Sequence, residues 1–203
     1  MKSVFKLLLG TVIIAAASCS GNGNSGATDT DSTANIMSSS TQAAADSNEK
    51  ELKAKDSTEV KADYEFAVEA ANGGMMEVEL GKLAQQKASS PQVVAFGKMM
   101  VTDHSKANTE LKALAASKII TLPAILANKS QMEFDKMAKL DKTEFEKQYV
   151  EFMVKDHKED IDKFKKEATD GKDAELKAFA AKTVPVLQHH LEEIQKIADA
   201  QKK

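Results

Sequence analysis

Along most of the chain after about residue 60, apolar residues recur at alternating steps of three and four. This spacing places them on one face of an α-helix. Four long segments carry such a stripe, and we predict helices over about 56–87, 91–117, 141–169 and 173–203. The first helix starts at either 56 or 63. A shorter helix is expected around 131–139, within the connection between the second and third segments.

Short polar motifs mark the ends of these helices. Residues 56–59 and 141–144 both read Asp-x-x-Glu, the spacing of a capping box. Ser90 can cap the second helix, because Pro91 at the first helical position has no N–H to leave unpaired. Gly171 ends the third helix. The short turns predict two antiparallel helix pairs, and the longer connection predicts a crossover between the pairs. The expected fold is therefore an all-α four-helix bundle with a long crossover, a layout that includes the ferritin-like bundle.

The composition of this region also favours helices, since Ala, Lys, Glu and Leu dominate and the chain has only three prolines. Gly73 and Gly74 interrupt the first helix. Each glycine costs a helix about 1 kcal/mol relative to alanine. Either the helix breaks at this point, or a neighbour packs closely against the bare backbone; of the two we expect the close packing.

The first residues of the chain have a different character. Lys2 and Lys6 precede an apolar run over 7–17. This run is shorter than the roughly 20 residues that a helix needs to span a bilayer. This order is typical of a secretory signal. The run ends Ala-Ala-Ala-Ser-Cys, which resembles a lipobox. Cys19 is the chain's single cysteine, and acylation accounts for it better than intermolecular pairing; the alternative is a plain signal peptide with a chance cysteine.

We therefore predict a lipoprotein with three regions: a signal peptide at 1–18, an acylated cysteine and disordered tether at 19–50, and a helical bundle domain at 51–203. The tether is expected because its Ser, Thr, Gly, Asn, Ala and Asp residues bury too little apolar surface to offset their ordering entropy. Lipid on Cys19 would anchor the domain to a membrane of the cell envelope. Ser20, which is not the aspartate of some inner-membrane lipoproteins, favours the outer membrane, with the domain facing the periplasm.

The charge balance narrows the classes of partner. The net charge is −3, and loss of the two signal-peptide lysines would make it more negative. Such a protein has no basic surplus for nucleic acid. The chain also contains no arginine, the side chain that binds phosphate and carboxylate groups in a bidentate manner. No protein partner can be named from the sequence.

Candidate chemistry is concentrated in the histidines. His104, His157 and His190 each lie on the apolar stripe of a different long helix. Counting from the turns at 1.5 Å per residue places Glu77 at nearly the height of His104 on the paired helix. The same count from Gly171 leaves His157 and His190 about 7 Å apart in height, a difference that a kink at Pro185 or a looser turn could alter. These four side chains are therefore candidates to converge in the middle of the bundle, one from each helix. Imidazole and carboxylate groups together suit iron, zinc or copper.

Asp103 and Asp156 directly precede two of these histidines, in the related pentapeptides Met-Val-Thr-Asp-His and Met-Val-Lys-Asp-His. Neighbouring residues on a helix point about 100° apart, so both aspartates should lie on flanking surfaces. They are candidates for hydrogen bonds that orient the histidines, for salt bridges between helices, or for solvated charge.

Several observations weigh against more elaborate chemistry. Histidines in a bundle core can serve packing alone by bonding a carboxylate. The Glu-x-x-His spacing of di-iron bundles is absent, because Val101, Val154 and Leu187 occupy the glutamate positions. The nine methionines offer thioethers to Cu(I), but methionine at helical spacing is more often core filler. No nucleophile–base pairing is evident, so no catalytic residue is assigned and the prediction leans away from an enzyme.

Four stretches of the sequence resemble the bacterial family known as domain of unknown function 4142; they are residues 66–71, 74–84, 100–104 and 186–191. The resemblance extends over about 60–200. It implies a ferritin-like helical bundle that is usually exported, and it implies no established activity.

Three functions remain open at this point. The first is a non-enzymatic binding or interaction bundle of the envelope. The second is a metal-binding bundle that holds iron, zinc or copper through Glu77, His104, His157 and His190, with Asp103 and Asp156 as supporting partners. The third is a structural spacer or stress protein of the envelope.

Overall fold

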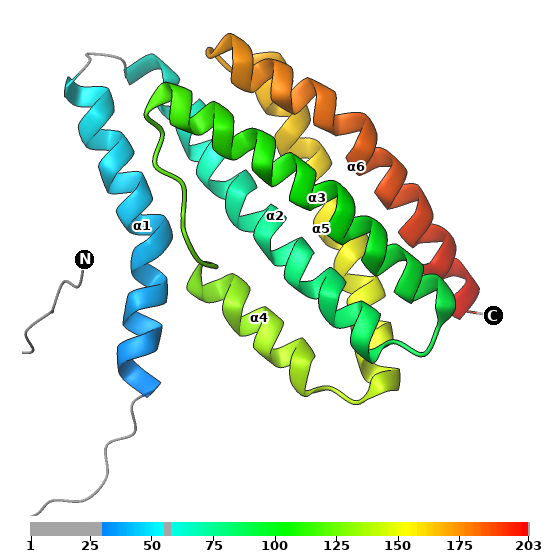
Figure 1. The fold of residues 1–203 in the computed structure, drawn as a ribbon. Coiled ribbons are helices and arrows are strands. Elements are labelled where there is room, and N and C mark those ends of the chain that lie inside the picture. Colours follow the sequence, from blue (N-terminus) through cyan, green and yellow to red (C-terminus); the bar gives the residue numbers. More distant parts are fainter. Residues whose placement is uncertain (1–29, 55–57, 203) are drawn as a thin grey trace, which may run out of the picture.

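The computed structural model describes residues 30–54 and 58–202. Its elements are α1 (Thr30–Ala54), the 3-10 helix η1 (Thr58–Val60), α2 (Lys61–Lys87), α3 (Pro91–Lys118), α4 (Asn128–Lys139), α5 (Lys142–Asp170) and α6 (Ala174–Gln201) (Figure 1). The described part of the chain contains no β-strand, so the all-α prediction is confirmed. None of the described helices has the length and apolar character needed to cross a membrane.

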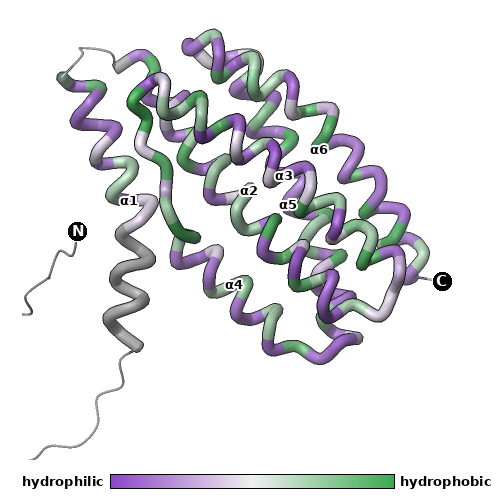
Figure 2. The backbone as a smooth tube through the Cα atoms, viewed as in Figure 1, coloured by the Kyte–Doolittle hydropathy of each residue, from purple (hydrophilic) through white to green (hydrophobic). Residues whose placement is uncertain are grey.

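The four long helices, α2, α3, α5 and α6, form the body of the molecule (Figure 1). Two antiparallel hairpins, α2–α3 and α5–α6, pack side by side. Hydrophobic and hydrophilic positions alternate along each of these helices (Figure 2). The shorter α4 lies in the crossover between the hairpins and packs against α2 and α5. With α1 the described chain has six α-helices, so the predicted four-helix bundle is too simple.

Helix α1 occupies part of the segment that we predicted to be a disordered tether. Ala44, Asn48 and Leu52, spaced four residues apart, are buried. The side-chain amide of Asn48 donates to the carbonyl of Thr121 at 3.0 Å, and its oxygen accepts from the Thr121 N–H at 2.7 Å. One narrow stripe is therefore enough to dock a polar helix against its neighbours. The predicted signal peptide and Cys19 lie outside the described residues.

Local capping explains where the bundle helices begin. The Ser90 hydroxyl accepts from the Val93 N–H at 3.5 Å, and the Asp141 carboxylate accepts from the Glu144 N–H at 3.0 Å, as predicted. The start of α2 differs, because Val60 precedes it and makes no side-chain cap. Part of the capping box predicted at 56–59 lies outside the described residues.

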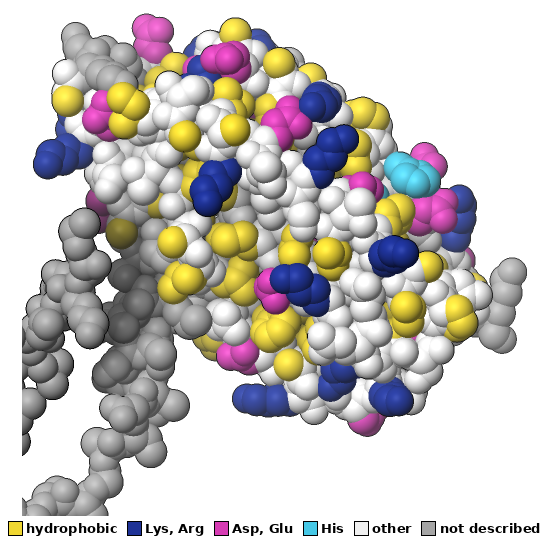
Figure 3. Space-filling model, viewed as in Figure 1, with side chains coloured by type: hydrophobic (Ala, Val, Ile, Leu, Met, Phe, Trp, Pro, Cys, Tyr) yellow, Lys and Arg dark blue, Asp and Glu magenta, His cyan; other side chains and the backbone are white. Residues whose placement is uncertain are grey.

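The apolar core has two parts. One cluster includes Tyr64, Leu111, Phe164, Leu176 and Leu187, and the other includes Leu80, Met100, Phe145, Tyr149, Met153 and Ile194. Along each long helix, the candidate site residue falls in sequence near the junction of the two clusters. A polar layer therefore crosses the bundle between two apolar ones. At the surface, the face drawn in Figure 3 carries lysines and acidic residues interspersed with one another.

Gly81 and Gly97 mark a close approach of α2 to α3. A Cβ atom added to either residue would lie 2.7 Å from the carbonyl oxygen of the other, so the helices would have to separate. We expect Gly97→Ala to lower the free energy of unfolding by about 1–3 kcal/mol, measured by urea denaturation.

Gly73→Ala is the matched control for this prediction. A Cβ at Gly73 would meet only the Asp160 Oδ2 atom, at 3.6 Å, so we expect no loss, or a gain of up to about 1 kcal/mol from helix propensity. Equal losses in the two variants would contradict the prediction. The close packing expected at Gly73–Gly74 occurs at Gly74, whose added Cβ would clash with Asn108.

Candidate metal centre

The polar layer contains the four residues that the sequence placed together. Glu77 comes from α2, His104 from α3, His157 from α5 and His190 from α6, and none is more than 6% exposed. One ring nitrogen of each histidine lies within 4.8 Å of those of the other two. Three imidazoles and a carboxylate, one from each long helix, therefore share one buried volume.

Hydrogen bonds on the outer side of the layer fix how two of the rings are protonated. His157 Nδ1 lies 3.0 Å from the Met153 carbonyl oxygen, which can only accept, so Nδ1 carries the hydrogen. His190 Nε2 lies 2.9 Å from the Asp103 carboxylate and donates to it in the same way. In neutral rings the remaining nitrogens, His157 Nε2 and His190 Nδ1, each hold a lone pair. These two atoms face each other at 3.4 Å.

The third ring is held by Glu77. His104 Nδ1 lies 2.7 Å from Glu77 Oε2, and His104 Nε2 is buried with no hydrogen-bond partner among the described residues. The other carboxylate oxygen, Glu77 Oε1, also has no hydrogen bond there and lies 3.5 Å from His157 Nε2. Each imidazole thus has one nitrogen bonded to an acceptor and a second that no ordinary hydrogen bond satisfies. Proteins orient metal-binding histidines in this way.

Burial determines the protonation of the layer. It lowers the pKa of His104 and of His190 to about 4 and that of His157 to about 3, from the ordinary 6.5; the neighbouring histidines add to the shift at His157 and His190. The rings are therefore neutral at pH 7, and their inward lone pairs are available to a cation. Burial also raises the pKa of Glu77 well above its usual range, and the charge of Asp160 adds to this effect.

The two predicted supporting aspartates lie in different surroundings. Asp103 reaches across to His190 on α6 rather than serving its neighbour His104. Asp156 makes no hydrogen bond or ion pair within the described part of the chain; its carboxylate lies within 4.8 Å of Glu77 and His157 ligand atoms. Burial raises the pKa of Asp156, and the charges of Glu77 and Asp160 add to the shift.

The family model for DUF4142, a domain of unknown function, matches residues 48–197. The chain belongs to this family. Among solved structures, one described as "CopM in the Cu(I)-bound form" is similar in fold, with a TM-score of 0.59 and 12% identity over 70% of this chain and 98% of that chain. At this identity the likeness concerns the fold alone. A comparison with curated proteins gave no match.

In this DUF4142 domain, two partners of the site were missed by sequence reasoning. Asp160 lies one turn after Asp156 on α5, and its side chain is 13% exposed and 3.3 Å from the Lys163 ammonium. The i, i+4 spacing of the two aspartates could have indicated a shared face. The Met153 carbonyl could not have been found, because a backbone acceptor leaves no signal in the sequence. Asp160 also lines a cavity of about 20 Å³ beside Glu77 and His104, enough for about one water molecule or ion.

Proposed function

We propose that this domain is a non-enzymatic metal-binding bundle of the cell envelope, which holds one zinc, copper or iron ion at His104, His157 and His190 with Glu77. The observation that carries the proposal is the 3.4 Å approach of His157 Nε2 and His190 Nδ1 in the buried core, where neutral rings with the hydrogens placed as above leave a lone pair on each atom. Two such atoms repel each other unless a cation lies between them. A metal ion bound to both nitrogens would remove this repulsion.

The donor set suits such an ion. Imidazole nitrogens and a carboxylate bind zinc, copper and iron, and ligand atoms about 2.0–2.2 Å from a tetrahedral ion lie roughly 3.3 Å from one another. The present nitrogens, within 4.8 Å of one another, would each move inward by about 1 Å, which side-chain rotation provides. Two of the buried polar atoms that lack a hydrogen-bond partner among the described residues, His104 Nε2 and Glu77 Oε1, lie in this layer, where a metal would satisfy them.

Two further considerations limit the kind of site. The Glu-x-x-His motif of di-iron bundles is absent at all three histidines, which favours a single ion. The similar structure is described as Cu(I)-bound, so copper must be tested beside zinc and iron. The binding bundle expected from the sequence is therefore proposed to bind a single transition-metal ion.

The direct test is metal analysis of the full-length chain after metal-free preparation and exposure to Zn²⁺, to Fe²⁺, or to Cu⁺ without oxygen. We expect one equivalent of at least one of these ions in the unchanged protein. A variant with His104, His157 and His190 all changed to alanine should retain none. The matched control is His189→Ala, which removes an exposed histidine next to the site. Unchanged metal content in the triple variant would overturn the proposal.

The low pKa values of the rings predict an unusual pH dependence of metal affinity. A proton competes with a metal for any ligand whose pKa lies above the pH. Three ordinary histidines would lose affinity steeply below pH 6.5, but the pKa values of these rings are only about 3 to 4. Between pH 7 and 5 we expect competition only from Glu77, at most about tenfold per pH unit. Chelator competition with Zn²⁺ measures the slope, and about a hundredfold or more per unit would contradict the prediction.

The location of the domain is also part of the proposal. The signal-like segment and Cys19 support attachment by lipid to an envelope membrane, on the outer-membrane leaflet that faces the periplasm. Cys19→Ser should move the protein from the membrane fraction to the soluble fraction of the envelope, because the acyl anchor is lost. Fractionation of cells producing either form measures this. A membrane fraction unchanged by the substitution would exclude the lipid anchor.

A further inference from the structure

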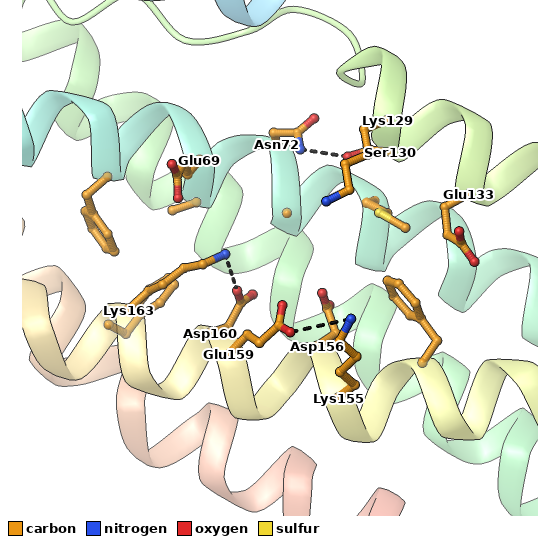
Figure 4. A pocket seen from close by; sticks show the side chains of 16 residues that line it. Glu69, Asn72, Lys129, Ser130, Glu133, Lys155, Asp156, Glu159, Asp160 and Lys163 are labelled. Atoms are coloured by element: carbon orange, nitrogen blue, oxygen red, sulfur yellow. Dashed lines mark hydrogen bonds and ion pairs between the residues drawn. The ribbon is translucent and has the colours of Figure 1, made fainter.

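A buried metal centre needs a path by which the ion enters. A pocket of about 550 Å³ lies between α2, α4 and α5 (Figure 4). Five carboxylates and three lysines line it. Asp156, Glu159 and Asp160 project from α5 toward α2 in this view, and Asn72 and Ser130 lie on the opposite side. The pocket therefore offers an approaching cation more carboxyl groups than ammonium groups.

The inner end of this pocket adjoins the metal centre. Asp160 and Phe164 line both the pocket and the small cavity that Glu77 and His104 border. Asp156, also in the pocket wall, has a carboxylate oxygen within 4.8 Å of ligand atoms of Glu77 and His157. Only side chains thus separate the surface pocket from the three histidines.

Two carboxyl groups, those of Glu77 and Asp156, lie close to the His157 ring at this junction. Glu77 Oε1 is unpartnered within the described chain, and its side chain is only 2% exposed. Asp156 likewise has no hydrogen bond or ion pair to any described residue. With His157 these oxygens make a second, oxygen-rich arrangement for a cation. Because His157 Nδ1 is committed to the Met153 carbonyl, Nε2 can serve only one ion at a time.

Given the proposed metal function, we propose that this pocket is the access port of the centre, the route by which a metal ion enters and leaves it. Glu77, Asp156 and His157 form an outer position that first receives a divalent transition-metal ion. The ion then moves inward to the three histidines and keeps its bond to His157 Nε2. Asp160 forms the wall past which it moves.

Gly73 provides a way to narrow the port without touching a ligand. It lies on α2 in the pocket wall, and an added Cβ would meet only Asp160 Oδ2, at 3.6 Å. A leucine at this position would project over Asp160. Because a gate changes rates in both directions equally, Gly73→Leu should slow metal binding and metal release by the same factor.

The experiment follows Co²⁺ binding to the full-length chain by stopped-flow visible absorption, and Co²⁺ release to excess chelator. We expect Asp156→Asn, which removes a carboxyl group from the path of the cation, to slow binding on the order of tenfold. Gly73→Leu should slow binding by a similar factor because it narrows the port. Release should slow in parallel, so that Kd changes by less than about threefold. The controls are Asp162→Asn, an equal charge change on the exposed face of α5, and Gly73→Ala; both should bind at the original rate.

The outcomes separate the two proposals. If the unchanged protein binds neither Co²⁺ nor the ions tested above, the metal function and the port both fall. If it binds one equivalent but Asp156→Asn and Gly73→Leu load at the original rate, the port alone is overturned. A slower rate in Asp162→Asn as well would mean general charge steering and would also overturn it. If Asp156→Asn weakens affinity at an unchanged binding rate, Asp156 belongs to the final site and the outer position does not exist.

Discussion

His157→Leu is expected to abolish stoichiometric metal binding and, at the same time, to make the metal-free domain more stable. The His157 ring is fully buried, and its Nε2 faces the His190 Nδ1 lone pair at 3.4 Å and Glu77 Oε1 at 3.5 Å. A leucine of similar volume removes the lone-pair contact with His190 Nδ1 and the cost of burying the imidazole. Replacing buried polar groups by well-packed apolar ones stabilises proteins by about 1–4 kcal/mol in favourable cases, and we expect a gain of about 1–3 kcal/mol here.

Urea denaturation in the presence of a chelator measures the stability, and metal analysis measures the binding. His189→Leu is the matched control: its imidazole is exposed, so neither quantity should change. The opposite signs are what make the experiment decisive. If the histidines served packing alone, His157→Leu would break a favourable polar network and lower the stability. That result would exclude a binding site whose buried histidines lower the stability of the metal-free domain.

The convergence of the four site residues could be predicted because helices are regular. Once Ser90 had been recognised as a turn residue, the rise per residue placed Glu77 and His104 at nearly the same height. The same count from Gly171 left His157 and His190 about 7 Å apart in height, so their meeting depended on the turn or on a kink at Pro185. The direction of each side chain followed from the apolar stripe. Both steps depend on local signals, and the caps at Ser90 and Asp141 form as expected. Glu77 was found in this way although it lies far along the chain from all three histidines.

The partners of these residues could not be predicted, because they depend on which helix lies at each flank. Asp103 and Asp156 precede their histidines in nearly the same pentapeptide. The first nevertheless bonds His190, on a helix of the other hairpin, whereas the second faces Glu77 and the pocket. A turn of about 100° between neighbours fixes only that each aspartate points aside. What it meets there is a property of the packed bundle.

Helix α1 shows a different limit of sequence reasoning. Its residues are small and polar, and composition alone indicated that they could not offset their ordering entropy. The docking depends on Leu52, on Ala44, and on the paired hydrogen bonds between Asn48 and Thr121. A contact between residues 73 positions apart has no local pattern. The signal available in the sequence was the amide side chain of Asn48, which lies four residues from the apolar residues Ala44 and Leu52.

Loading with the metal should produce the largest change in thermal stability. A ligand that binds only the folded state stabilises it by RT ln(1 + [L]/Kd), about 4 kcal/mol at a thousand times Kd. For a domain of this size, each kcal/mol raises Tm by about 2–4 °C, so saturation should raise Tm by roughly 10 °C. Melting followed by circular dichroism, with metal and with chelator, measures the shift.

The same measurement locates the binding, because repulsion inside the layer exists only without the ion. The unchanged protein and His189→Leu should both gain stability with metal. His157→Leu should melt at one temperature with or without metal, above that of the metal-free unchanged protein. The stability gained with metal would then come from ligation by the buried nitrogens. It would not come from exposed carboxylates, because all three proteins retain those. An equal gain in His157→Leu would place the ion elsewhere and remove the reason for three neutral histidines to share a buried core.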